Sequence, residues 1–233
     1  IREHKVGLDQ LPQRPHRIEK HADVRHHQRV FGYTHEELRI LLAPMARNGA
    51  EPIGSMGSDV PLAVLSQRSR QLFEYFKQLF AQVTNPPLDA IREELVTAIG
   101  STIGPEGNLL DPGPTAVRQL ELPYPVITSD ELRTIVRVNE DGDLPQFETH
   151  IVNSLFEVAG GGTALEAALD RACREASEAI QRGAKILVLS DRGATAELAP
   201  IPSLLLTGAV HHHLIREKSR TKVGLIVESG DAR

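Results

Sequence analysis

Residues 147–189 decide the fold, and they read FETHIVNSLFEVAGGGTALEAALDRACREASEAIQRGAKILVL. The first ten residues alternate between apolar and polar side chains, which predicts a β-strand. Three glycines, 160–162, then lead into an alanine-rich amphipathic segment over 163–182, which predicts a helix. Gly183 is the expected end of this helix, and the apolar run 185–189 predicts a second, buried strand.

The same alternation of elements continues toward the end of the chain. Residues 202–218 predict another helix, and the apolar run 223–227 predicts a third strand. Strand, helix, strand, helix, strand is the order of a parallel sheet with right-handed crossovers. We therefore expect an α/β fold that ends in a βαβαβ parallel sheet. The chain starts at Ile1 rather than Met and stops just after this third strand, so we also expect a piece of a longer polypeptide.

The segment before this sheet is predicted to be mainly helical. Thr34 and Glu37 form a capping-box pattern that starts a helix with Leu38, Leu41, Leu42 and Met45 on one face. Apolar and aromatic residues at helical spacing over 72–83 predict a second helix, with a core position or a buried domain contact as its role. Asp89 is the expected N-cap of a third helix, whose apolar face would hold Ile91, Leu95, Val96 and Ile99.

Shorter elements are predicted between this third helix and the sheet. Residues 100–114 are rich in Gly and Pro and predict a loop. Residues 125–127 predict a short buried strand, and the capping residues at 128–131 predict a brief helix that ends at Val136.

The first 33 residues differ from the rest in charge and pattern. They hold seven basic and four acidic residues, together with five of the ten histidines, and their apolar residues are few and aperiodic. This composition predicts an extended basic arm, 1–33, that crosses another surface; a free disordered tail is the alternative. Residues 34–233 are then expected to form the main domain.

Composition excludes several classes of function. The net charge of −5 argues against nucleic acid as the main partner, because phosphate binding needs clustered positive charge. The single cysteine, Cys173, excludes an intrachain disulfide and any site that needs several thiolates, and it favours a reducing, cytoplasmic setting. The sequence has no apolar run of about 18 residues, so no membrane partner is expected.

Two polar turns are candidates for chemistry at the predicted sheet. The turn Gly160-Gly161-Gly162-Thr163 could hold an anion at a helix N-terminus, but it lacks the phosphate-loop and dinucleotide glycine spacings. We therefore favour a tight structural turn. Ser190-Asp191-Arg192 follows a predicted strand, where parallel α/β folds place their sites. A buried Asp–Arg pair that fixes the loop is the favoured interpretation there.

The remaining polar clusters offer little for catalysis or metal binding. Side chains at consecutive helix positions point about 100° apart, so His211, His212 and His213 cannot converge on one metal ion. His213 and Glu217 share a helix face, but two ligands are only half a site. Cys173 lies inside an amphipathic helix, and no serine lies in a nucleophile-elbow context. We therefore expect no catalytic, cofactor-binding or metal-binding residues in this chain.

Several segments, in this order, resemble the central domain of the glutamate synthase large subunit. The resemblance covers nearly the whole chain, including the arm. Its segments are Gly54-Ser55-Met56-Gly57, residues 76–87 (FKQLFAQVTNPP), Asp89, Ile91-Arg92-Glu93-Glu94, Gly107-Asn108-Leu109-Leu110, Leu189-Ser190-Asp191-Arg192 and residues 208–214 (GAVHHHL).

The resemblance implies a role within a larger enzyme, here called the parent enzyme. Glutamate synthases convert glutamine, 2-oxoglutarate and reductant into two glutamates and so assimilate ammonia. An amidotransferase domain releases ammonia, and a domain that binds FMN and a 3Fe-4S cluster uses it. The central domain connects these two partner domains, and its fold is described as a reduced TIM barrel. The FMN and the cluster are implied for the parent enzyme, not for this chain.

The resemblance also implies a wall of an ammonia tunnel, to which Met56, Thr84 and Asn85 would contribute. A tunnel needs apolar walls with a few polar groups, and Met56 offers a flexible side chain in a glycine-flanked loop. Thr84 and Asn85 precede two prolines at an expected helix end. The alternative is that Met56 fills a core gap and Asn85 caps a helix.

The chain departs from the complete enzyme, since it has no amino-terminal cysteine and no cysteines for a cluster. We therefore expect the isolated chain to be inactive and to bind no FMN. Two other functions stay open at this point. One is a stand-alone α/β domain that binds a small ligand beside Asp191, Arg192 and Gly160. The other is an interaction module with no role in a tunnel.

Overall fold

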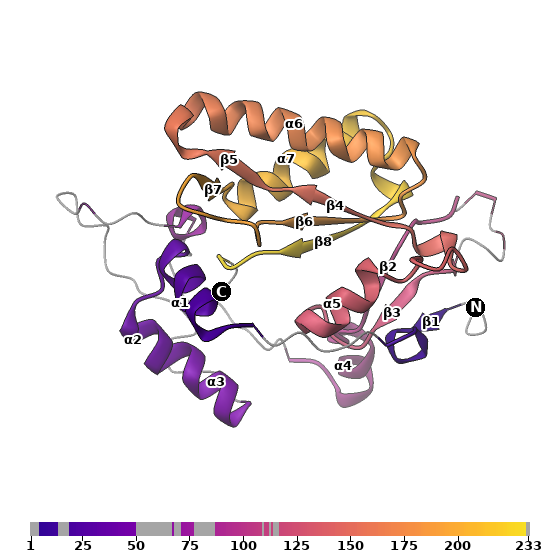
Figure 1. Ribbon diagram of the computed structural model, residues 1–233. Coiled ribbons are helices and arrows are strands. Elements are labelled where there is room, and N and C mark those ends of the chain that lie inside the picture. Colours follow the sequence, from indigo (N-terminus) through magenta and orange to yellow (C-terminus); the bar gives the residue numbers. More distant parts are fainter. Residues whose placement is uncertain are drawn as a thin grey trace.

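The computed structural model describes residues 5–13, 19–49, 67, 71–76, 87–108, 110–111, 113 and 117–231. The second half of the chain forms the predicted α/β unit, with three parallel strands in the order β4-β6-β8. Figure 1 shows helices α6 and α7 together on one face of this sheet. The elements are β4 (Thr149–Asn153), α6 (Gly161–Gln181), β6 (Ile186–Ser190), α7 (Ser203–Arg216) and β8 (Gly224–Glu228).

The sheet and the two helices share one apolar core. Four of the six alanines of α6 are buried, so the helix backbone can lie close to the strands; they are Ala168, Ala172, Ala176 and Ala179. β6 is the central strand, and four of its five residues are buried, as a continuous apolar run predicts for a parallel strand. Residues 152, 168, 172, 176, 179, 187, 189, 206, 210 and 214 belong to this core.

The predicted strand over 147–156 is divided in the structure. It begins as a 3-10 turn, η6 (Pro145–Phe147), continues as β4, and restarts after Ser154 as β5 (Leu155–Glu157). β5 pairs antiparallel with β7 (Leu198–Pro200) in a separate two-stranded ribbon. The Asn153 side chain accepts a hydrogen bond from the Leu155 backbone N–H, which stabilises the bend between the two strands. Alternation alone could not place this break.

A second, smaller layer packs near the other face of the parallel sheet, below it in Figure 1. It consists of a three-stranded sheet in the order β1-β3-β2 and of helix α5. Phe147, Ile135 and Leu120 are fully buried here, together with Ile186 of β6, so this second core is continuous with the parallel sheet. Its elements are β1 (Val6–Gly7), η2 (Leu8–Gln10), β2 (Ser101–Ile103), β3 (Leu120–Leu122) and α5 (Ser129–Val136).

Two sequence predictions in this layer are wrong. The strand lies at Leu120–Leu122 and not at 125–127, where Val126 is 83% exposed. Pro125 lacks a backbone N–H, which disfavours a place in a strand ladder. The predicted loop 100–114 contains β2, which pairs antiparallel with β3. The predicted helix start is confirmed, because Thr128 and Glu131 form a capping box on α5.

The predicted extended arm contains a helix. α1 (His21–Val30) has no buried residue, so apolar periodicity could not reveal it. Its charges follow the helix dipole, with Asp23 in the first turn and His27 and Arg29 in the last turn. The extended prediction is therefore wrong for His21–Val30.

The next helical segment begins where the sequence predicts it to begin. The Thr34 hydroxyl accepts a hydrogen bond from the Glu37 backbone N–H, and Glu37 closes the capping box. The segment runs through α2 (His35–Glu37), a π-helical turn η3 (Leu38–Leu42) and α3 (Ala43–Asn48). Its apolar face is only partly covered, since Met45 is 51% exposed.

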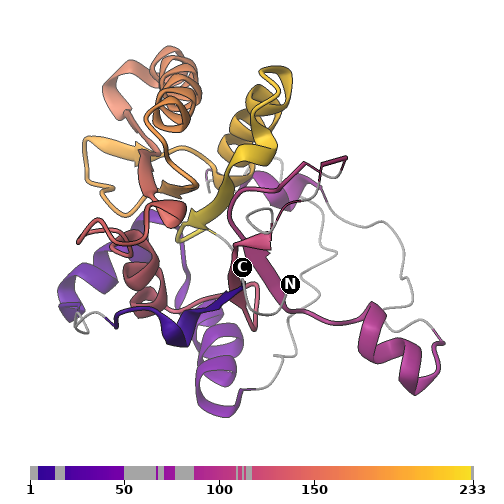
Figure 2. The same cartoon turned by 90° about the vertical axis from the view of Figure 1, so that its right-hand side faces the viewer.

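The remaining helices before β2 are less covered still. Within the predicted helix 72–83 the structure has a 3-10 turn, η4 (Leu72–Tyr75), after which Phe76 is 73% exposed; residues 77–86 lie outside the described part. A core role is therefore wrong for Phe76. Helix α4 (Ala90–Val96) projects from the rest of the chain in Figure 2, and the Asp89 side chain caps it as predicted.

The strands of the described residues do not close into a barrel. What the structure supports is a mixed α/β fold with a three-stranded parallel sheet, preceded by helical segments. Helices α6 and α7 are the crossovers between its strands, as the sequence predicts.

Candidate functional site at the carboxyl edge of the parallel sheet

The carboxyl ends of β6 and β8 meet at one edge of the sheet, which is where parallel α/β folds bind ligands. β6 ends at Ser190, in register with Glu228 of β8. The Ser190 hydroxyl donates a hydrogen bond of 2.5 Å to Glu228 Oε2. Asp191 and Arg192 follow directly, so the sequence places these residues at this edge correctly.

The expected pair between Asp191 and Arg192 is not formed. Arg192 Nε instead donates to Glu228 Oε1 at 2.5 Å, and Arg192 Nη1 contacts Glu19. The physical reason is exposure: the Arg192 side chain stays 41% exposed beside Glu228, so its charge keeps part of its hydration. Asp191 is only 4% exposed and contacts the loop after β8.

That loop, residues 229–231, holds a second buried carboxyl group. The Ser229 hydroxyl lies 2.5 Å from Asp191 Oδ2 and 2.7 Å from Asp231 Oδ1. Asp231 is 6% exposed, and its Oδ2 accepts a hydrogen bond of 2.9 Å from the backbone N–H of Ser203, the first residue of α7. The loop therefore joins β6, β8 and the start of α7.

The electrostatics of this edge let Asp191 keep its proton to a higher pH than an ordinary aspartate does. Burial raises the pKa of the Asp191 carboxyl to about 6, and the negative charges of Asp231 and Glu228 add to this effect. The Ser229 hydroxyl and the Gly230 backbone N–H act in the opposite direction, because they stabilise the carboxylate form.

The N-terminal segment covers the same edge. Glu19 forms an ion pair with Arg192, and Phe31 is 5% exposed against the loop after β8. A Cβ atom on Gly230 would lie 2.4 Å from Phe31 Cδ2, so the ring and this glycine are in direct contact. The side chains at this edge are thus paired with one another and with the N-terminal segment. They do not form the deep pocket that a stand-alone ligand-binding domain would need.

Sequence reasoning missed four members of this cluster, Glu19, Glu228, Ser229 and Asp231. Ser229 and Asp231 follow a predicted parallel strand just as Asp191 does, so the same rule about carboxyl ends could have found them. Glu19 carries no local signal, because its partner Arg192 lies 173 residues away.

The glycine turn before α6 has a structural explanation. Gly161 has φ +55°, a conformation that side chains rarely adopt. A Cβ on Gly160 would lie 2.5 Å from the Ala164 side chain. Gly161 is therefore required by its backbone conformation, and Gly160 by its close contact with the Ala164 side chain. Gly183, at φ +106°, ends the helix region as predicted.

Two of the three histidines of α7 contact different partners. His211 Nδ1 accepts a hydrogen bond from Arg220 Nε at 3.0 Å, whereas His213 Nε2 lies 2.8 Å from the Ser177 hydroxyl of α6. Glu217 also contacts Ser177, and it lies 3.4 Å from His213. This cluster connects α6 to α7.

Cys173 lies on α6, at the edge of the main core. Burial, and then the charge of Asp170, raise the pKa of its thiol. A raised pKa lowers the thiolate fraction, and the thiolate is the nucleophile. The position thus favours packing over catalysis.

The three proposed tunnel residues, Met56, Thr84 and Asn85, lie outside the described residues. Their expected role stays a prediction from the resemblance. Asp89, from the same group of motifs, is described and caps α4.

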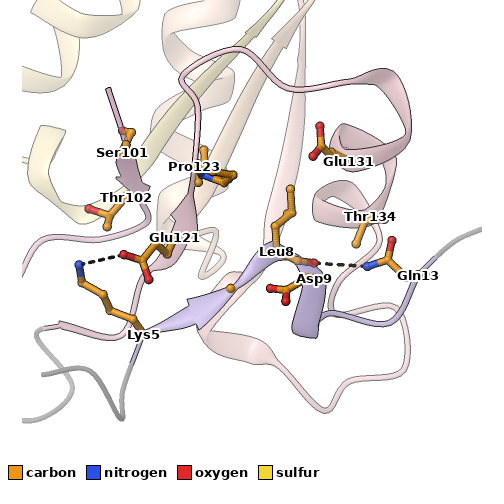
Figure 3. A pocket seen from close by; sticks show the side chains of 13 residues that line it. Lys5, Leu8, Asp9, Gln13, Ser101, Thr102, Glu121, Pro123, Glu131 and Thr134 are labelled. Atoms are coloured by element: carbon orange, nitrogen blue, oxygen red, sulfur yellow. Dashed lines mark hydrogen bonds and ion pairs between the residues drawn. The ribbon is translucent and has the colours of Figure 1, made fainter. Parts of the chain in front are cut away.

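A shallow hollow of about 840 Å³ lies between the small sheet and α5, as Figure 3 shows. Four of the polar side chains that line it have partners within the chain. Lys5 Nζ lies 3.6 Å from Glu121, Gln13 donates to the Leu8 carbonyl, and Glu131 caps α5. We assign no ligand to it.

The described part of the chain offers no metal site and no membrane-spanning helix. No three His, Cys, Asp or Glu side chains there are grouped so that they could hold a metal ion. None of the described helices is both long and apolar enough to cross a membrane. The sequence has one cysteine, which does not fit the thiolates that a 3Fe-4S cluster needs.

Comparison with known proteins agrees with the motifs. The family profile described as "Glutamate synthase central domain" matches residues 26–233. The chain is 45% identical over 218 residues to "Glutamate synthase (NADPH) large chain" of Bacillus subtilis, which covers 92% of this chain and 14% of that protein. It is 44% identical to "Glutamate synthase (NADH)" of Schizosaccharomyces pombe, covering 88% of this chain and 10% of that protein.

A third relative is named for a different electron donor. "Ferredoxin-dependent glutamate synthase 2" of Synechocystis sp. is 45% identical over 87% of this chain, which spans 13% of that protein. The region is thus similar in relatives named for three different electron donors, and it spans only a small part of each. Because the family profile covers most of the sequence, this chain belongs to the glutamate synthase central domain family.

Proposed function

We propose that the chain is the connecting domain of a glutamate synthase, between its amidotransferase and FMN-binding domains. The parent enzyme would convert glutamine, 2-oxoglutarate and reductant into two glutamates. Family membership supports this proposal, together with the small share of each relative that the chain spans. The likeness of the βαβαβ unit to a reduced TIM barrel is part of the same proposal.

One structural observation carries the connecting role. Among the described residues, none covers the apolar side chains of α4 and of the segment after it: Ile91 is 86% exposed, Leu95 is 82% exposed and Ile99 is 59% exposed. Ile91 and Leu95 are four positions apart, so they lie on one stripe along α4. Ile99 lies three positions beyond the last residue of the helix and extends the exposed apolar surface. Contiguous apolar stripes of this kind mark protein interfaces. We infer that another domain of the parent enzyme covers this stripe.

A substitution on the stripe tests the connecting role. Leu95→Asp should change the free energy of unfolding of the isolated chain by less than about 0.5 kcal/mol, because the side chain is already exposed. In the parent enzyme it should cost roughly 1–2 kcal/mol, since a buried apolar contact is lost. Glu93→Gln on the opposite side of α4 is the matched control and should be neutral in both. If Leu95→Asp changes the free energy of unfolding equally in the two proteins, the proposed contact with another domain is wrong.

The finer proposal is that Met56, Thr84 and Asn85 line an ammonia tunnel. It rests on the resemblance, and the alternative is a connecting module whose residues play no part in transfer. Thr84→Trp in the parent enzyme should slow glutamate synthesis from glutamine more than synthesis from added ammonium, which can bypass a tunnel. If both rates fall together while stability drops, Thr84 is an ordinary core residue.

We also propose that the isolated chain makes no glutamate and binds no FMN. Its one cysteine is half-buried in α6 with a raised thiol pKa, so it is a poor candidate for an amidotransferase nucleophile. A cytoplasmic setting and the lack of a nucleic-acid partner belong to the same proposal; they rest on the single cysteine and on the net charge of −5. Purified chain that carries flavin at one-to-one stoichiometry would contradict it.

A further inference from the structure

The hydrogen bonds among Asp191, Ser229 and Asp231 need more protons than two ionised carboxyl groups and one hydroxyl group supply. One hydroxyl group lies within hydrogen-bond distance of two buried carboxyl groups. A hydroxyl has a single proton, so it can donate to only one of them. If both carboxyl groups were ionised, the other contact would bring a hydroxyl lone pair against a carboxylate oxygen.

Each carboxyl group accepts one backbone N–H, from Gly230 at Asp191 and from Ser203 at Asp231, so the helix end at Ser203 is what distinguishes them. Asp231 Oδ2 accepts the Ser203 N–H at the start of the 14-residue helix α7, where the helix dipole favours a negative charge. The Asp231 N–H itself donates to Ser229 Oγ at 3.2 Å. A protonated Asp191 can then donate to Ser229 Oγ while the Ser229 hydroxyl donates to Asp231. In this arrangement each short contact has one proton.

We propose that Asp191 and Asp231 share one proton through Ser229. This shared-proton contact of Asp191, Ser229 and Asp231, here called the clasp, holds the 229–231 loop in place. The N-terminal segment packs on that loop. The clasp closes when the proton is bound and loosens when it leaves, because two buried carboxylates then face each other. This is a pH-sensitive device of the fold, separate from the proposed connecting role.

The other charges around Asp191 do not remove the need for this proton. Glu228 on β8 adds a further negative charge nearby. The adjacent cation, Arg192, contacts both Glu228 and Glu19, so its charge is already matched by two carboxylates.

The loop transmits the change to the N-terminal segment through Gly230. Gly230 lies between the two clasp residues of the loop, and the Phe31 ring packs directly on it. The Gln71 side chain donates to the Phe31 carbonyl at 2.8 Å, which is a second contact that holds the segment. If charge repulsion displaces the loop, the packing of the Phe31 ring against Gly230 therefore changes.

Carboxyl ¹³C titration by NMR of the complete 233-residue chain, with hydrogen exchange of the segment around Phe31, tests the clasp. The Asp191 carboxyl should titrate about one pH unit or more above an ordinary aspartate. Exchange around Phe31, corrected for its intrinsic pH dependence, should rise severalfold as this group loses its proton. In Asp231→Asn, the Asp191 midpoint should fall, because Ser229 is then free to donate to Asp191, while burial should keep it above the value of an ordinary aspartate.

Asp191→Asn supplies the matched variant, since its amide donates to Ser229 without a titrating proton. Exchange around Phe31 should then be independent of pH and match the protonated wild type. An ordinary Asp191 midpoint in the wild type would overturn the shared proton, even if the variants failed to fold. A raised midpoint with no pH dependence of exchange around Phe31 would overturn the clasp.

Discussion

The two halves of the chain carry similar apolar patterns but cover them differently. In the βα half, residues 147–231, the apolar positions of α6, β6 and α7 meet in one closed core. In the first half, the apolar positions of α4 follow an equally regular pattern, and yet its stripe lies open. Periodicity therefore predicts which face of an element is apolar, but not which molecule covers that face.

The largest expected effect comes from the core of the βα half. Leu187→Ala should lower the free energy of unfolding by about 2–5 kcal/mol, because Leu187 is fully buried and its removal leaves a cavity. Ile91→Ala, the corresponding truncation in the open half, should cost less than about 0.5 kcal/mol. Urea unfolding of the two variants measures both. Similar losses would mean that α4 packs within the chain in solution.

The pH dependence of stability should come from the βα half. The folded pKa of Asp191, about 6, lies above its unfolded value of 3.8, so the folded state binds more protons between these values. Stability should therefore fall as the pH rises from 4 to 6, by roughly 2–3 kcal/mol from this group alone. Unfolding curves of the wild type and Asp191→Asn isolate the contribution, which the variant should lack. If the difference in free energy of unfolding between the wild type and Asp191→Asn does not vary with pH, Asp191 is not the source of the pH dependence.

A smaller effect is expected where the N-terminal segment meets the βα half. Gly230→Ala should cost about 1–3 kcal/mol, because the new Cβ would overlap the Phe31 ring. Gly162→Ala is the matched control within α6: nothing lies within 4 Å of the added Cβ, so it should be neutral or slightly stabilising. Thermal unfolding compares the two variants. An unchanged melting temperature in Gly230→Ala would show that Phe31 does not pack against Gly230.

Much of the fold could be predicted from the sequence, for reasons that differ along the chain. The βαβαβ order, the Gly183 stop and the caps at Thr34, Asp89 and Thr128 are local signals, and the structure confirms them. The break after Ser154 and the strand Ser101–Ile103 depend on pairing with distant residues, which a local pattern does not encode. Helix α1 escaped prediction because it buries no residue.

The candidate site shows the same division. Asp191 and Arg192 could be placed at the sheet edge, because the end of a parallel strand is recognisable from its sequence. Their partners could not be assigned, since Arg192 binds Glu19 from the far end of the chain and Asp191 contacts a loop that only the fold brings near. For Met56, Thr84 and Asn85, the resemblance remains the whole basis of the predicted role.

Hydrogen exchange of the isolated chain and of the parent enzyme tests the central contrast most directly. The account predicts strong protection of α6, β6 and β8 in both proteins. It predicts that residues 90–99 of α4 and its continuation exchange rapidly in the isolated chain and become protected only in the parent enzyme. Equal protection of α4 in the two proteins would contradict the account, because its apolar stripe would then have no partner outside this chain.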